Sequence, residues 1–248
     1  MNSSAAYTSK AVKYARYRWD YAPQAIERIL HTANITLAAV VVDIGAGTGI
    51  MTRHFMGKAG QVIAVEPNAE MRRLAEEALV GDPTCRVIDG LAEATILPSA
   101  CADLIVAAQA ANWFDPPAAR DEFRRILKPD GWLAILRNFG TDQEMNAAME
   151  KIYPPETDTA EIMKGRGIPA DFYFEDGDFV RQRFEFTEKA NWEQFFGAAC
   201  TASYAPDEGS PLFEQFERDA RQVFAVHQIE GFVLTHGVTE LWLGKMGR

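Results

Sequence analysis

The sequence predicts an α/β protein built on a doubly wound sheet. Three observations carry this prediction. Short apolar runs alternate with helix-compatible segments over residues 40–138, the first run ends at three closely spaced glycines, and the second ends at an acid followed by proline. Strands that alternate with helices form right-handed βαβ units, and successive units build such a sheet.

The composition is that of an ordinary globular protein. The chain has 248 residues, 48% apolar and 24% charged, which suffices for one large domain or a core with a small addition. Its 25 basic and 35 acidic residues give a net charge of −10, without a dense cluster of lysine and arginine. A nucleic acid backbone would be repelled, so we expect a small-molecule ligand and no nucleic acid partner.

Cysteine usage and hydropathy set the expected compartment. Cys85, Cys101 and Cys200 show no CxxC pairing, which indicates neither a disulfide framework nor a structural zinc site. No leader opens the chain and no apolar run approaches the ~20 residues that span a bilayer. We therefore expect a cytoplasmic, metal-free protein without a membrane partner.

The N-terminal segment combines a polar start with an aromatic arm. Residues 1–9 are small and polar, and we expect them to be disordered. Tyr14, Tyr17, Trp19 and Tyr21 follow among basic residues and lead into a first helix. These rings either cover a cavity or pack the helix onto the sheet, and the sequence leaves both interpretations open.

The first expected strand is Val41–Ile44. It ends at Gly45, Gly47 and Gly49, and the helix-compatible segment Ile50–Met56 follows. Glycine allows positive φ angles and close approach of a ligand to the backbone, while the N–H groups at a helix start favour negative charge. The turn therefore predicts a site for a polar or anionic small molecule.

The second expected strand, Gln61–Val65, ends at Glu66 and Pro67, and the helix Asn68–Val80 follows. A carboxylate at this strand end lies beside the glycine turn and can accept hydrogen bonds from both ribose hydroxyls of a nucleotide. The alternative is a solvated acid that the helix macrodipole favours.

Two further strands extend the predicted core. Cys85–Ile88 ends at Asp89 and Gly90, which either line an adenine pocket or form only a turn. Ala102–Ala108 ends at the polar and aromatic cluster of residues 109–115, at the sheet edge where open α/β folds bind ligands.

The remaining elements are less sharply defined. Residues 154–169, with Met163 and the run Lys164-Gly165-Arg166-Gly167, are predicted to be a polar insertion. The expected helices are Pro116–Leu127, Thr141–Ile152, Trp192–Tyr204 and Leu212–Val226, and the expected strands are Trp132–Arg137, after a turn at Lys128–Gly131, Phe172–Thr187 and Phe232–Gly244.

The glycine spacing distinguishes two classes of nucleotide-binding protein. A dinucleotide fingerprint needs a third glycine five residues after the first, and Ile50 stands at that place. An NAD-type oxidoreductase is thus the weaker alternative.

The motifs, in order, resemble those of the class I S-adenosylmethionine-dependent methyltransferases. The resemblance is to the small-molecule (type 11) group that includes the trans-aconitate methyltransferases and the ubiquinone/menaquinone C-methyltransferases. The matching segments are Val42–Gly49, Val65–Asn68 with Met71, Gly90–Glu93, Asp103–Val106 through Trp113-Phe114, Phe123–Leu133 and, in the arm, Tyr14–Pro23.

This resemblance implies a Rossmann-like sheet of seven strands, mostly parallel with an antiparallel last strand, and a helical cap over the acceptor pocket. Within one structural domain, residues 1–30 would be the aromatic arm and first helix, 31–140 the cofactor-binding core, and 141–248 the rest of the sheet with the cap.

The resemblance also implies roles for individual residues. Gly45 and Gly47 would let the backbone approach the methionine part of the cofactor, Glu66 would hold the ribose hydroxyls, and Tyr17 and Arg18 would reach the cofactor carboxylate. The implied cofactor residues are Tyr17, Arg18, Asp43, Gly45, Ala46, Gly47, Glu66, Pro67, Met71, Gly90, Leu91, Ala92 and Gln109.

The acceptor side is predicted from aromatic residues of the arm and the C-terminal half. Plain core packing is the alternative for each of them. The candidate substrate residues are Tyr14, Trp19, Asn112, Trp113, Trp192, Phe196 and Tyr204.

A dedicated catalytic base is optional for methyl transfer, because alignment and exclusion of water supply much of the acceleration. The related group often has a histidine where this chain has Asn112. Weak candidates for a base or an orienting group are Tyr14, Asn112, His227 and His236.

The sequence therefore predicts an enzyme that transfers methyl groups from S-adenosylmethionine to a small, apolar or aromatic acceptor, releasing S-adenosylhomocysteine, as a monomer or homodimer. An alternative from another class is a protein that binds the cofactor without methyl transfer, because a fold alone does not fix function.

Overall fold

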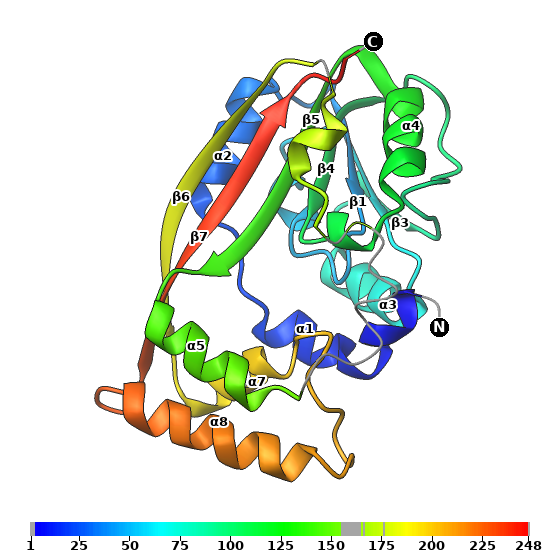
Figure 1. Cartoon of the computed structure of the whole chain (residues 1–248). Helices are drawn as coiled ribbons and strands as arrows, with labels where there is room; N and C mark the ends of the chain where they lie inside the picture. The colour runs from blue at the N-terminus through cyan, green and yellow to red at the C-terminus, as the bar shows by residue number, and fades with distance from the viewer. Residues whose placement is uncertain (1–2, 155–164, 166, 176, 248) are drawn as a thin grey trace.

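The computed structural model describes residues 3–154, 165, 167–175 and 177–247. They form a seven-stranded sheet in the order β3-β2-β1-β4-β5-β7-β6, in which β7 runs antiparallel to the other six strands (Figure 1). The predicted fold class is confirmed. The strands are β1 (Val40–Ile44), β2 (Gln61–Val65), β3 (Cys85–Ile88), β4 (Ala102–Ala108), β5 (Leu127–Gly140), β6 (Phe179–Ala190) and β7 (Val233–Gly244).

Helices cover both faces of the sheet and gather below one end of it. The α-helices are α1 (Ala11–Tyr17), α2 (Pro23–Thr32), α3 (Ala69–Ala78), α4 (Pro116–Ile126), α5 (Gln143–Ile152), α7 (Trp192–Ala199) and α8 (Phe213–His227). Short 3-10 helices are η1 (Ser3–Lys10), η2 (Thr52–Phe55), η3 (Ala111–Trp113) and η4 (Ala170–Tyr173). Among the described residues, no helix has the length and apolarity needed to cross a membrane.

Two hydrophobic clusters fill the two faces of the sheet. Ile26 and Ile29 of α2 pack with Val41 of β1 on one face, while Phe123 and Ile126 of α4 pack with other strand residues on the opposite face. Strands buried on both faces need apolar side chains at consecutive positions, which explains why β1 and β4 are apolar except for Asp43 and Asp103.

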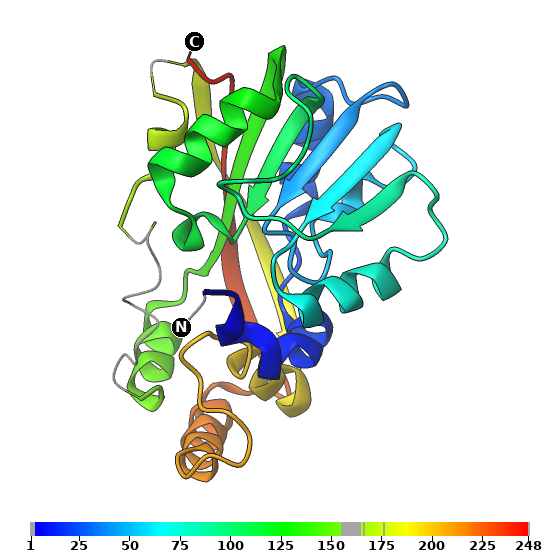
Figure 2. The ribbon, with the colours of Figure 1, turned by 90° about the vertical axis from the view of Figure 1, so that its right-hand side faces the viewer.

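The helices α1, α5, α7 and α8 lie together beyond the carboxyl ends of the parallel strands (Figures 1 and 2). α7 packs against both α1 and α8, and α5 packs against α8. The N-terminal arm and the C-terminal helices therefore meet at the edge of the sheet where α/β folds bind ligands.

Three expectations near the sheet edge are wrong. Residues 3–9, expected to be disordered, lie in η1. The helix expected at Ile50–Met56 is only η2, because i→i−3 hydrogen bonds such as His54 N–H to the Met51 carbonyl replace most of the helical ones. The alternation of strands and helices also predicts a helix before β4, but residues 89–101 contain none.

The later elements differ mainly in their ends. Lys128–Gly131, expected as a turn, lies within β5 at the place where the pairing between β5 and β4 shifts register. β6 begins at Phe179, later than expected, because Tyr173 belongs to η4 and stacks on Phe123. Most of the insertion predicted at 154–169, including Met163, Lys164 and Arg166, lies outside the described residues.

Candidate functional site

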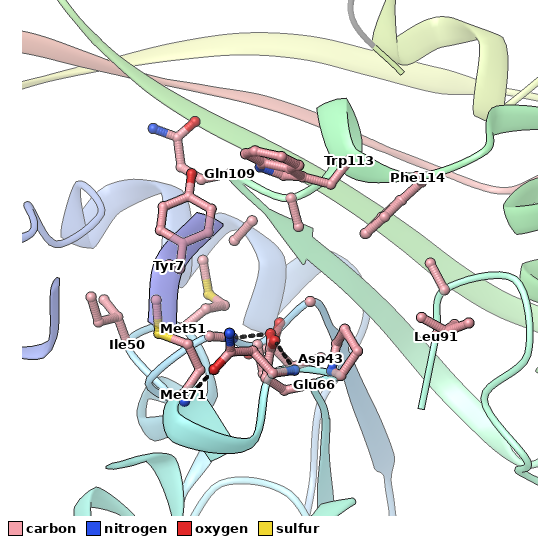
Figure 3. A pocket seen from close by; sticks show the side chains of 18 of the residues that line it. Tyr7, Asp43, Ile50, Met51, Glu66, Met71, Leu91, Gln109, Trp113 and Phe114 are labelled. Atoms are coloured by element: carbon pink, nitrogen blue, oxygen red, sulfur yellow. Dashed lines mark hydrogen bonds between the residues drawn. The ribbon is translucent and has the colours of Figure 1, made fainter. Parts of the chain in front are cut away.

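A cavity of about 640 Å³ opens at the carboxyl ends of β1, β2 and β4. Figure 3 shows Leu91 and Phe114 at one end of it, Tyr7 and Ile50 at the other, and Glu66 between them. We call it the first cavity. Most of the predicted cofactor residues line it, namely Asp43, Gly45, Ala46, Gly47, Glu66, Pro67, Met71, Leu91, Ala92 and Gln109.

The glycine turn gives the first cavity a backbone surface. Gly45, Gly47 and Gly49 have φ angles of 69°, 56° and 83°, so the predicted left-handed conformation is confirmed. A Cβ atom on Gly45 would lie 2.6 Å from the Cβ of Ala110, whereas one on Gly47 would meet only Tyr14, at 4.0 Å. Gly45 is thus required by packing, and Gly47 leaves space at the cavity surface.

Glu66 is oriented by two backbone N–H groups. Gly47 donates to its Oε2 at 2.9 Å and Asn68 donates to its Oε1 at 2.8 Å. The side chain is 7% exposed, and this burial raises the pKa of Glu66. Because each carboxylate oxygen can accept a second hydrogen bond, both remain able to bind hydroxyl groups of a ligand.

Asp43 is a buried acid with one unsatisfied oxygen. Its Oδ2 accepts a hydrogen bond of 2.6 Å from the Thr52 hydroxyl, while Oδ1 has no partner among the described residues. Burial raises the pKa of Asp43 to about 7. A buried polar atom without a partner at a cavity surface fits a ligand that brings a donor or an ordered water.

The far end of the first cavity combines an apolar surface with fixed acids. Leu91, Ala92 and Phe114 line it, and Glu93 Oε1 accepts a hydrogen bond of 2.6 Å from the N–H of Asp115. Gly90 does not line the cavity, since a Cβ there would lie 2.8 Å from Val65. This end suits a planar heterocycle with polar edges, such as adenine.

A second cavity, of about 920 Å³, lies between the arm and the C-terminal helices. A side-chain hydrogen bond joins the two cavities: Gln109, which lines the first, donates from Nε2 to the carbonyl of Asn138, which lines the second, at 3.0 Å. Asn138 is held in turn by Thr239, whose hydroxyl donates to its Oδ1 at 2.7 Å. The two cavities are thus close neighbours.

The candidate substrate residues divide between the two cavities. Tyr14 and Trp113 line the first, and Trp19 and Tyr204 line the second. Trp192 and Phe196 line neither, because they stack on each other in the cap at 5.0 Å between ring centroids. The positions of Trp192 and Phe196 agree with the alternative interpretation, in which both residues serve core packing.

Tyr17 and Arg18 line the second cavity and not the first. The Tyr17 hydroxyl donates to Glu193 at 2.7 Å, which turns its ring toward α7. The Arg18 guanidinium lies 5.4 Å from the centre of the Tyr14 ring. Their positions therefore depart from the expectation that both reach the cofactor carboxylate.

The polar candidates for catalysis lie apart from both cavities, except for Tyr14. Asn112 is exposed and its carbonyl accepts a hydrogen bond from the N–H of Gly165. His227 ends α8, and His236 is exposed on β7, where it bonds to Thr187. All four histidines of the chain are among the described residues, and none lines either cavity.

Sequence reasoning missed several lining residues. Tyr7 lies in the segment expected to be disordered, yet its ring packs against both Tyr14 and Trp113. Met51 also lines the first cavity and Tyr153 the second. A single tyrosine in a polar stretch carries no periodic signal, so only the packing of the arm reveals Tyr7.

Comparison with known proteins identifies the core. Residues 42–135 match the family model described as "Methyltransferase domain". This segment holds β1 to β4, most of β5 and the glycine turn. The core of this chain is similar to known methyltransferase domains. Glu66 and Asp43 also lie within this matched segment.

Curated relatives carry the same name over part of their length. An uncharacterised methyltransferase of Mycobacterium tuberculosis is 36% identical over 135 residues, 54% of this chain and 53% of that protein. A malonyl-[acyl-carrier protein] O-methyltransferase of Pectobacterium atrosepticum is 32% identical over 110 residues, 44% of this chain and 42% of that protein. The chain thus spans about half the length of the curated relatives it matches.

Solved structures extend the likeness in fold to the whole chain. The YcgJ protein of Bacillus subtilis aligns with a TM-score of 0.60 at 18% identity, covering 91% of this chain and 99% of that one. A geranyl diphosphate C-methyltransferase of Streptomyces coelicolor, solved with S-adenosyl-L-homocysteine, aligns with a TM-score of 0.51 at 12% identity, covering 90% and 78%. At these identities the likeness concerns the fold of the methyltransferase domain and its additions.

Proposed function

We propose that this protein transfers a methyl group from S-adenosylmethionine to a small organic acceptor held in the second cavity. The observation that carries the proposal is the pair of neighbouring cavities joined by the Gln109–Asn138 hydrogen bond. One cavity has the features of a nucleoside and amino acid site, and the other is large enough for a second molecule.

The first cavity would bind the cofactor along its length. Glu66 would accept hydrogen bonds from the ribose hydroxyls, with its own orientation fixed by Gly47 and Asn68. Asp43 would bind the amino acid part through its free Oδ1, directly or through water. Leu91 and Phe114 would enclose the adenine. When bound, S-adenosylmethionine supplies a methyl group on a positively charged sulfur, which makes that carbon electrophilic.

The residues around the donor would act by alignment and by excluding water. Tyr7, Tyr14 and Trp113 form an aromatic group at the first cavity, with Tyr7 in edge-to-face contact with both others. Aromatic rings remove water and tolerate an adjacent positive charge. The acceptor atom would then attack in line while the carbon–sulfur electron pair returns to sulfur.

We infer that no histidine serves as the base. None of the four lines a cavity, and burial raises the pKa of Tyr7 to about 12, so its hydroxyl is neutral near pH 7. The acceptor would therefore ionise without help or lose its proton to solvent after transfer. We place the enzyme among those acting on small molecules, because its net charge of −10 disfavours nucleic acid.

The test is binding followed by turnover. S-adenosylhomocysteine should stabilise the purified protein against heat in a concentration-dependent manner, and NAD or NADH should not, because Ile50 replaces the third glycine of a dinucleotide site. S-adenosylhomocysteine should then form from S-adenosylmethionine with at least one acceptor of a broad metabolite panel. Stabilisation by NAD alone would support the oxidoreductase, and binding without turnover would favour a non-catalytic cofactor-binding protein.

A further inference from the structure

The second cavity contains an arginine without an acidic partner. Arg18 follows α1 and is half-buried, with its guanidinium over the Tyr14 ring. Its side chain donates one hydrogen bond, from Nη1 to the Thr201 hydroxyl at 3.2 Å. Within the described part of the chain, no carboxylate forms an ion pair with Arg18.

The surroundings of Arg18 do not compensate its charge. Tyr7, Tyr14, Tyr21 and Tyr153 lie around the guanidinium, and a tyrosine hydroxyl is uncharged near neutral pH. Thr201 is buried, and its own hydroxyl proton goes to the Ala198 carbonyl at 2.6 Å. A guanidinium has five N–H donors, so several remain directed toward no protein acceptor.

The other arginine of this cavity is already paired. Arg16 binds Glu193 at 2.8 Å and is largely exposed. Asp20, also a lining residue, binds Arg53 at 2.6 Å and His54 at 2.7 Å. The remaining charged lining residues are Glu150, Glu188 and Lys189.

We propose that Arg18 binds a carboxylate of the acceptor, so that the acceptor is an aromatic or apolar carboxylic acid. This inference rests on the proposed function. A single planar guanidinium matches a carboxylate in bidentate geometry, and one negative charge balances it. A phosphate dianion would bring excess negative charge next to Glu150 and Glu188.

The other residues that line the second cavity indicate the chemistry of the rest of the acceptor. Trp19, Tyr153 and Tyr204 supply aromatic surface, and Met145 and Met149 supply adaptable apolar surface. The Tyr153 ring meets that of Tyr204 edge to face at 4.8 Å. A ring or chain would pack here while its carboxylate stays on Arg18.

The anchored carboxylate is not the methylated group. The guanidinium takes up one lone pair on each carboxylate oxygen, and pairing with a cation makes the carboxylate a weaker nucleophile. The methyl group would go to another atom of the acceptor. Transfer forms one bond from that atom to carbon, breaks one carbon–sulfur bond, and leaves the carboxylate free in the product.

The experiment compares acids with their uncharged amides. The protein saturated with S-adenosylhomocysteine is titrated by calorimetry with phenylacetate and phenylacetamide, then with indole-3-acetate and indole-3-acetamide. We expect at least one acid to bind about tenfold more tightly than its amide. Arg18→Met should abolish this preference and Arg18→Lys should keep part of it, while S-adenosylhomocysteine affinity stays unchanged in both.

The controls separate this proposal from the proposed function. Arg73→Met removes an exposed arginine that pairs with Glu70 and Glu77, and it should change neither affinity. Equal binding of acid and amide, no binding of either acid, or loss of S-adenosylhomocysteine affinity in Arg18→Met with acid binding intact would each overturn the role of Arg18. Failure of the wild-type protein to bind S-adenosylhomocysteine would instead overturn the proposed function. Any product that is a methyl ester of a monocarboxylic acid, detected by its lability to alkali, would also contradict the anchor.

Discussion

Glu66 shows how a single side chain is prepared for a ligand before the ligand arrives. Its two oxygens are held by N–H groups from opposite sides, one from the glycine turn and one from the start of α3. In the proposed function, the carboxylate would therefore lose little freedom on binding a ribose, which would favour affinity.

Replacing Glu66 by alanine or glutamine should weaken S-adenosylhomocysteine binding by more than about tenfold, as expected for a lost charge-assisted bidentate contact. Affinity should also fall as the pH is lowered, because burial raises the pKa of Glu66 and the protonated acid accepts fewer hydrogen bonds. Calorimetric titration measures both. Glu70→Gln changes an exposed acid of α3 and serves as the control. Wild-type affinity in the Glu66 variants would refute the assignment.

The raised pKa of Asp43 leads to a second prediction, on the pH dependence of stability. Its folded pKa of about 7 exceeds the ordinary value of 3.8, so between these values the folded protein holds a proton that the unfolded chain has released. The free energy of unfolding of the ligand-free protein should therefore decrease as the pH rises through this interval. Asp43→Asn should show a flatter dependence and gain stability relative to wild type as the pH rises, measured by urea denaturation at a series of pH values.

The contribution of Asp82 to stability should change with pH in the opposite direction, so Asp82 serves as a comparison. Hydrogen bonds from Thr84 lower the pKa of Asp82, so its contribution to stability is present at neutral pH and lost on acidification. Asp82→Asn should thus lose stability relative to wild type as the pH rises. An Asp43→Asn curve parallel to the wild-type curve would show that Asp43 is ionised in the folded protein.

Among the elements, the N-terminal arm depends most on distant contacts. Lys10, which is 6% exposed at the junction of η1 and α1, donates from Nζ to the carbonyls of Ala202, Ser203 and Ala205 at 3.0, 3.0 and 2.6 Å. These bonds fix the arm, including Tyr7, to the loop after α7. Burial lowers the pKa of Lys10.

Lys10→Met should destabilise the protein by about 2 kcal/mol, since it removes three hydrogen bonds from a charged group, one of them to the buried Ala205 carbonyl. In this variant, the exchange of amide hydrogens should accelerate relative to the wild-type protein, and more in η1 and α1 than in the sheet, as measured by mass spectrometry. Lys13→Met removes a pair with the exposed Glu208 and should cost about 1 kcal/mol or less. Unchanged exchange in Lys10→Met would mean that the arm is held by its aromatic contacts.

The sheet was predictable because short sequence patterns within each strand indicate its position. β2 and β4 match the expected ranges, and the glycines of the turn have the predicted backbone conformation. Burial on both faces selects consecutive apolar residues, and a required positive φ angle selects glycine. Both features can therefore be predicted without knowledge of distant parts of the chain.

The acceptor side was less predictable because it depends on which way side chains point from short helices. Tyr14 and Tyr17 lie three residues apart in α1, yet one lines the first cavity and the other turns to Glu193 of α7. Asn112 and Trp113 are adjacent, and only the tryptophan faces the cavity. These choices are made by long-range packing, which carries no periodic signal in the sequence.

The hydrogen bond between Gln109 and the Asn138 carbonyl connects a residue inside the segment that matches the methyltransferase domain with a residue outside it. Every residue lining the second cavity lies outside residues 42–135, the part shared with the methyltransferase family, whereas most of those lining the first lie inside it. Substitutions of residues that line only the second cavity should therefore leave most of the first cavity unchanged. Under the proposed function, such a chain could acquire a new acceptor through substitutions in the second cavity alone, and a library confined to the residues of that cavity is the natural route for redesigning its specificity.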